Sequence, residues 1–132
     1  MNRLRFLRLW SLAVGAMDAS TGLLLVTAPV VTLKWMGIPP LDQAAWVFLS
    51  WIGVFVAAVG LSYGWVFRGE REGETVWFFT GLVRLLVAVF LVVKILGGAL
   101  PMAWITVAIT DAVVGAGQWF FVRAGWWRGG DG

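Results

Sequence analysis

The sequence predicts an all-α integral membrane protein with four transmembrane helices. Of its 132 residues, 61% are hydrophobic and only 13% are charged, about half the charged fraction of a typical soluble domain. A soluble domain of this length buries only about two-thirds of its surface, so it could not hide so many apolar side chains. Four apolar runs are each long enough to cross a bilayer as a helix. An outer-membrane barrel would instead show alternating segments of about ten residues.

The four apolar runs define the expected spans. They cover about residues 9–28, 44–67, 75–96 and 101–122. Pro29 follows the first run, Asp42 is a suitable N-cap for the second, and Gly97 with Gly98 closes the third. Pro101 suits the first turn of the fourth. Because the linkers after the second and third spans are short, we expect a single domain over residues 1–132, folded as an antiparallel up-down bundle.

Basic residues set the expected orientation of the spans. Seven arginines lie beside one set of span ends: Arg3, Arg5, Arg8, Arg68, Arg71, Arg123 and Arg128. The opposite loop holds Lys34, and Lys94 lies near that opposite end. By the positive-inside rule, both termini are cytoplasmic. The formal net charge of +3 therefore reflects topology and contact with membrane lipid, and we expect no nucleic-acid partner.

Nine of the ten tryptophans agree with this orientation, and the tenth, Trp51, lies deeper in its span. Tryptophans form belts at both faces of a membrane, where the ring is apolar and the N–H reaches water. The cytoplasmic ends hold Trp10, Trp65, Trp77, Trp119, Trp126 and Trp127, and the external ends hold Trp35, Trp46 and Trp104. Residues 30–36, between the first two spans, could rest as a short helix in the external interface.

Three charged residues lie where the hydropathy pattern predicts the centre of the bilayer. Asp18 is at the middle of the first span, Asp111 at the middle of the fourth, and Arg84 within about one turn of the middle of the third. Left unpaired, each would cost about 2.5–3.5 kcal/mol. We therefore expect them to form an Asp–Arg–Asp layer, or to face water or a partner chain. Two carboxylates and one guanidinium leave one negative charge without compensation. The two carboxyl groups should therefore share one proton, or an external cation should balance the remaining charge.

Small residues share helix faces with these charges. Such seams let membrane helices approach closely. The expected packing residues are Gly15, Gly22, Gly53, Ala57, Gly60, Gly64, Gly81 and Gly115. Gln118 lies two turns from Asp111 on the same face of the fourth span, so it joins the predicted polar layer.

The residue types that are missing exclude several classes of function. The chain has no histidine and no cysteine, so it offers neither imidazole nor thiolate to haem, iron or zinc. Asp18, Asp111 and Gln118 give too few ligands for a dedicated metal site. We therefore expect no cofactor, no metal and no catalytic residues, and we predict that the protein is not an enzyme.

Two functions remain open from the sequence. The first is an accessory or assembly subunit, whose charged layer orders its helices while its outer surface contacts lipid or a larger membrane complex. The second is a small proton-coupled carrier or solute-binding protein, working as a homodimer, in which Arg84 holds the substrate while Asp18 and Asp111 exchange a proton. The sequence slightly favours the first. For either, we expect a place in the inner, cytoplasmic membrane of a bacterium.

Overall fold

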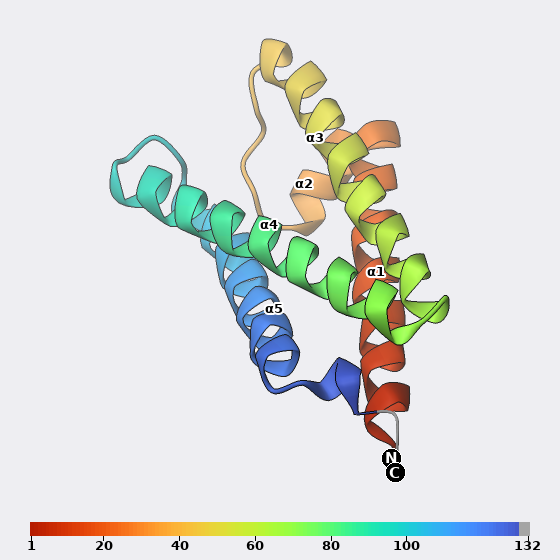
Figure 1. The fold of residues 1–132 in the computed structure, drawn as a ribbon. Coiled ribbons are helices and arrows are strands. Elements are labelled where there is room, and N and C mark those ends of the chain that lie inside the picture. Colours follow the sequence, from red (N-terminus) through yellow and green to blue (C-terminus); the bar gives the residue numbers. More distant parts are fainter. Residues whose placement is uncertain (130–132) are drawn as a thin grey trace. The chain divides into compact units, whose positions relative to one another are not determined.

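The computed structural model describes residues 1–129, and these residues fold into helices joined by short loops (Figure 1). Within this part of the chain, four helices are long and apolar enough to cross a membrane: Arg3–Thr27, Gln43–Phe67, Glu70–Leu96 and Met102–Arg123. The all-helical class and the four apolar helices predicted from the sequence are therefore confirmed.

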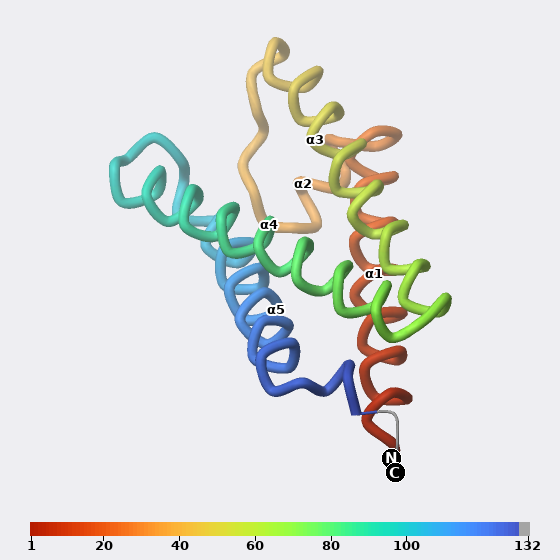
Figure 2. The backbone as a smooth tube through the Cα atoms, in the orientation of Figure 1, coloured from red at the N-terminus to blue at the C-terminus, as the bar shows by residue number. Residues whose placement is uncertain are grey.

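The elements follow one another with little chain between them (Figure 2). In order they are α1 (Arg3–Thr27), α2 (Pro29–Trp35), α3 (Gln43–Ser62), η1 (Tyr63–Phe67), α4 (Glu70–Leu96), η2 (Met102–Trp104), α5 (Ile105–Arg123) and η3 (Trp126–Arg128). The chain forms two compact units. The N-terminal unit is residues 9–64, and the C-terminal unit combines residues 1–8 with the chain from residue 65 onward. The single bundle domain stays a prediction.

In the N-terminal unit, α1 and α3 pack with their backbones in contact. A Cβ atom added to Gly22 would lie 2.5 Å from the carbonyl oxygen of Gly53 and 2.8 Å from Cα of Ala57. A Cβ atom added to Gly15 would lie 2.9 Å from the carbonyl oxygen of Gly60. Later residues of α1 thus meet earlier residues of α3, so the two helices are antiparallel. The glycines allow an approach that any side chain would prevent.

Gly64 lies outside this contact, although the sequence predicts it as a packing residue. A Cβ atom added there would have no neighbour within 4 Å. The reason is that α3 ends at Ser62 and the chain continues as the 3-10 helix η1. A 3-10 helix turns by more per residue than an α-helix, so the row of small residues leaves the packed face.

The short helix predicted between the first two spans is present as α2. Pro29 occupies its first turn, where a missing N–H costs nothing. The helix ends at Trp35, and Gly37, just after the C-cap, has a left-handed φ of 71°. The N–H of Ile38 then donates to the carbonyl of Leu33 at 2.9 Å, which closes the helix in a Schellman motif.

The C-terminal unit is built on the antiparallel hairpin of α4 and α5. Helix α4 begins at Glu70, before the predicted apolar span that starts near residue 75, so much of the predicted linker is helical. Glu70 and Glu72 lie in the first turn, where carboxylates interact favourably with the helix dipole. The apolar run in the sequence does not show where the helix begins, because the first turn of the helix is polar. Helix α1 likewise begins in polar sequence, at Arg3.

The turn between α4 and α5 follows the predicted glycine pair. Gly98 has a left-handed φ of 73°, which a residue with a side chain adopts only at a cost. The N–H of Ala99 donates to the carbonyl of Lys94 at 2.9 Å, and the N–H of Gly98 donates to that of Ile95 at 3.0 Å. Asp42 and Pro101 also occupy N-cap positions, but neither side chain makes a capping hydrogen bond.

Aromatic side chains close the end of the C-terminal unit where α4 begins and α5 ends. Phe6 packs edge-on against Phe121, with ring centroids 5.6 Å apart, and Trp77 packs edge-on against Trp127 at 5.5 Å. Trp77 is 0% exposed and Trp127 is 1% exposed, so these two rings are core residues rather than members of an interfacial belt. Gly73 makes room for them: a Cβ atom there would lie 2.6 Å from Cη2 of Trp127.

Candidate functional site

The α4–α5 hairpin buries a row of side chains that includes the predicted polar residues. On α4 the buried positions recur every three or four residues, as expected for one helix face. They are Gly73, Trp77, Thr80, Gly81, Arg84, Ala88, Leu91 and Ile95. The facing residues of α5 are Ala108, Asp111, Gly115 and Gln118. We refer to the polar members Thr80, Arg84, Asp111 and Gln118 as the polar seam.

An ion pair joins the two helices in this seam. Arg84 Nη1 donates to Asp111 Oδ1 at 2.5 Å, and the two side chains are 5% and 16% exposed. A hydrogen bond between two charged groups is about twice as strong as a neutral one. The charges predicted for the third and fourth spans therefore meet within one hairpin.

Glycines bring the helices together at the height of this pair. A Cβ atom added to Gly115 would lie 3.1 Å from Cβ of Arg84 and 3.1 Å from the carbonyl oxygen of Gly81. One added to Gly81 would lie 2.6 Å from the ring of Trp119. The two predicted packing glycines thus form the part of the contact that surrounds the ion pair.

A second polar contact lies toward the end where α4 begins. Gln118 Nε2 donates to Thr80 Oγ1 at 2.9 Å, and Thr80 Oγ1 donates to the carbonyl of Val76 at 2.7 Å. Gln118 is 0% exposed and Thr80 is 1% exposed. Thr80 is not among the residues predicted from the sequence, although it precedes Arg84 by four residues, and that spacing places both on one helix face.

We expect Gln118→Leu to lower the free energy of unfolding by only about 0.6 kcal/mol, because interhelical hydrogen bonds in membranes are worth about that much on average. Thr80→Val should cost a similar amount, and the double variant should cost less than the sum. Reversible unfolding in mixed micelles measures all three. Thr110→Val is the matched control, since Thr110 Oγ1 bonds only within its own helix, to Thr106. A cost near zero for Gln118→Leu would show that this bond does not hold the helices.

Asp18 belongs to the other unit. It lies in α1, is 8% exposed, and follows the packing residue Gly15 by three positions. The structure brings Arg84 and Asp111 together. The predicted participation of Asp18 in the same layer stays a prediction.

A second ion pair ties the chain after α5 to the start of α4. Arg128 donates through Nη2 to Glu74 Oε1 at 2.6 Å and through Nε at 2.9 Å. The hydrogen bond and the charge of Glu74 raise the pKa of Arg128 above its ordinary value, and burial opposes this shift. A raised pKa adds stability that is fully present below the ordinary value and is lost only above the raised one. Titration of Arg128 therefore adds no pH dependence to folding near neutral pH.

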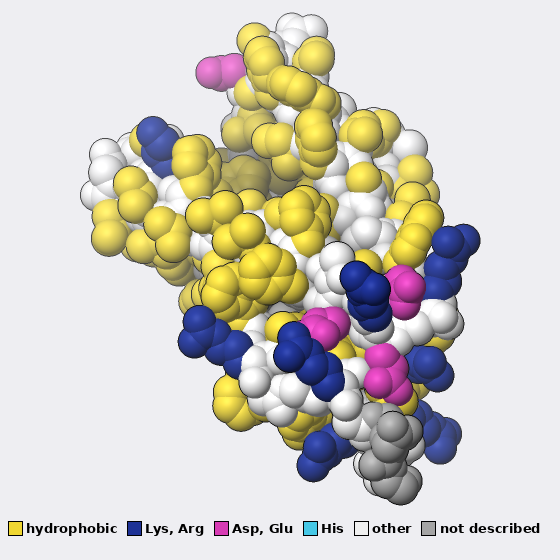
Figure 3. Space-filling model, viewed as in Figure 1, with side chains coloured by type: hydrophobic (Ala, Val, Ile, Leu, Met, Phe, Trp, Pro, Cys, Tyr) yellow, Lys and Arg dark blue, Asp and Glu magenta, His cyan; other side chains and the backbone are white. Residues whose placement is uncertain are grey.

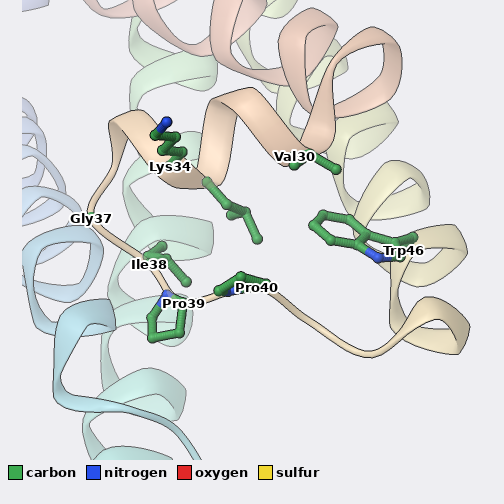
Figure 4. Close-up of a pocket in the computed structure, with 8 residues that line it drawn as sticks. Val30, Lys34, Gly37, Ile38, Pro39, Pro40 and Trp46 are labelled. Carbon is green, nitrogen blue, oxygen red and sulfur yellow. The ribbon is translucent and has the colours of Figure 1, made fainter.

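The N-terminal unit contains a pocket of about 430 Å³ between α2 and the start of α3. Figure 4 shows Ile38, Pro39, Pro40 and Trp46 around it, while Lys34 extends from α2 away from the two prolines. Apart from Lys34, the side chains that line this space are apolar, so the pocket favours an apolar occupant.

The chemistry available in the polar seam is that of one carboxyl group, one guanidinium, one amide and one hydroxyl. Among residues 1–129, no group of three or more acidic, histidine or cysteine side chains is placed to hold a metal ion. Comparison with protein-family models, with curated proteins and with solved structures finds no match. What the protein does must then be inferred from its own residues.

Proposed function

We propose that the chain is an integral protein of a bacterial inner membrane and acts as an accessory or assembly subunit. Its four apolar helices cross the bilayer as an antiparallel bundle with both termini in the cytoplasm. The buried charges hold the helices in register, and the outer apolar faces contact lipid or a partner subunit.

The observation that carries this proposal is the Arg84–Asp111 ion pair. The guanidinium reaches its partner at 2.5 Å inside its own hairpin, and 5% of its side chain is exposed. Sliding one helix past the other by one turn, about 5.4 Å, would break this pair and also the bond from Gln118 to Thr80. Two contacts at different heights therefore select one register, which is the best-attested role for buried polar groups.

The exposed faces of the long helices support a membrane environment. On helix α3, five large apolar side chains are each between 53% and 73% exposed: Val47, Phe48, Trp51, Ile52 and Phe55. Helix α4 does the same with Phe79, Leu86, Val89, Phe90 and Val93. Apolar patches this extensive mark lipid or protein contacts.

The proposal is tested by extracting the tagged chain from membranes in mild detergent and recording its native mass spectrum. We expect companions, either further copies of the chain or other membrane proteins. Asp111→Asn should reduce the amount of stable complex, because it removes a charge from the pair that fixes α5. A chain that runs alone, with Asp111→Asn as stable and as abundant as the parent, would contradict the proposal.

A proton-coupled carrier is the second candidate, and the buried carboxyl group of Asp18 favours it. A carboxyl group in the middle of an apolar helix marks an ion or proton pathway in many membrane proteins. Asp18→Asn separates the two functions. A carrier variant should fold normally and lose proton-linked flux in proteoliposomes, whereas a subunit variant should lose stability or fail to copurify with its partner. Flux that depends on Asp18 would replace the assembly proposal.

A further inference from the structure

The end of the C-terminal unit where α4 begins carries an excess of positive charge. Seven arginines lie there in the sequence: Arg3, Arg5, Arg8, Arg68, Arg71, Arg123 and Arg128. In the described part of the chain, Arg128 pairs with a carboxylate and the other six do not. Figure 3 shows dark blue side chains gathered there, with magenta side chains among them. This surface, which we call the arginine end, has cationic groups left over for an external anion.

Three of these arginines lie over tryptophan rings. The guanidinium carbon of Arg68 is 5.0 Å from the centre of the Trp65 ring. Arg3 lies 5.7 Å from the Trp126 ring, and Arg123 lies 5.8 Å from the Trp119 ring. Each distance is within the range of a cation–π interaction.

This stacking prepares the guanidinium to bind an anion. A cation–π attraction to a neighbouring ring restricts the motion of the guanidinium, while its N–H groups form a fixed planar fork. That fork matches two oxygens of a phosphate group. A lysine at the same position would present only a point charge.

The three stacks share one end because of how the unit folds. Arg68 lies two residues before α4, and Arg123 is the last residue of α5. The N-terminal segment joins them, because the Phe6 ring contacts Trp126 with centroids 5.9 Å apart.

We propose that the arginine end binds the phosphate groups of anionic phospholipids, with the guanidinium groups of Arg3, Arg68 and Arg123 as the donors. The site rests on the membrane insertion proposed above. A lipid fits better than a free anion because the partner rings are amphipathic: Trp65 is 53% exposed, and an exposed indole is most stable at the level of lipid headgroups. An anionic lipid adds a net charge that complements the surplus of arginines.

The test uses the full chain in mild detergent, with phosphatidylglycerol or phosphatidylcholine added in equal amounts and bound lipid counted by native mass spectrometry. We expect preferential retention of phosphatidylglycerol. Trp65→Leu keeps every charge and removes one stack, so it should weaken that retention about two- to fivefold. Arg68→Lys should weaken it similarly. Arg71→Lys is the matched control, since Arg71 lies over no aromatic ring in the described part of the chain, and it should have little effect.

Several results would overturn the proposal. Equal retention of the two lipids would do so, and so would equal effects of Arg68→Lys and Arg71→Lys. Displacement of the lipid by millimolar inorganic phosphate would indicate a free-phosphate site instead, and displacement by an oligonucleotide would indicate a nucleic-acid surface. If the chain enters phosphatidylcholine nanodiscs but shows no preference for phosphatidylglycerol, only the lipid site is refuted. If the chain enters no bilayer, the membrane proposal itself is refuted.

Discussion

Arg84→Gln should lower the free energy of unfolding by about 3–5 kcal/mol, the usual cost of removing one partner from a buried ion pair. The variant leaves the Asp111 carboxylate in a largely buried position, at 16% exposure, without the guanidinium that holds it at 2.5 Å. The measurement is reversible unfolding in mixed micelles, followed by circular dichroism or tryptophan fluorescence. Arg71→Gln removes an arginine that has no carboxylate partner among residues 1–129, and it should change stability by less than about 0.5 kcal/mol.

The double variant Arg84→Met, Asp111→Leu shows whether the loss comes from the pair or from the arginine alone. Replacing both partners of a buried pair with apolar residues is often neutral, because no charge is left without a partner. We therefore expect the double variant to be more stable than Arg84→Gln. If Arg84→Gln is as stable as Arg71→Gln, the ion pair does not hold the hairpin and the register proposal is wrong.

The same double variant tests the predicted layer of three charges. If Asp18 also depends on Arg84, then removing Arg84 and Asp111 leaves its carboxyl group buried without compensation, and stability should return only when Asp18→Leu is added. If the double variant already recovers and Asp18→Leu changes nothing, Asp18 is independent of the seam.

The sequence predicts those features that depend on the composition of a single helix. Hydropathy found four apolar helices because each is a continuous run, and helical spacing placed Arg84, Asp111 and Gln118 on faces that do meet. Hydropathy does not show how far α1 and α4 extend beyond the apolar runs, because their first turns are polar.

Features that depend on two distant segments were harder to predict. Trp77 and Trp127 resemble belt residues in sequence, yet they pack against each other. The reason is that the chain turns after α5 at Gly125, which has a left-handed φ of 69°. This turn allows Trp127 of η3 to pack against Gly73. Gly64 continues the row of small residues on α3, but the change from α3 to η1 removes it from the contact with α1. Neither a local return of the chain nor a change of helix type alters the hydrophobic pattern.

Gly22→Ala should destabilise the N-terminal unit by about 1–3 kcal/mol, the usual cost of an extra methyl group in a full core. The added carbon would lie 2.5 Å from the carbonyl oxygen of Gly53 and 2.8 Å from Cα of Ala57. These obstacles are backbone atoms, which cannot move aside by changing a rotamer, so α1 and α3 must separate. The larger Gly22→Val should cost more. Unfolding in mixed micelles measures the loss.

Gly64→Ala is the control that separates close packing from the general effect of replacing a glycine. Both substitutions add one methyl group and both reduce the freedom of the unfolded chain, which by itself stabilises the fold by about 0.4–1 kcal/mol. At Gly64 the new carbon would meet no atom within 4 Å, so Gly64→Ala should be neutral or slightly stabilising. If Gly22→Ala lowers the free energy of unfolding and Gly64→Ala does not, the cost therefore arises in the contact between α1 and α3. Equal effects would mean that the small residues are not what holds these helices together.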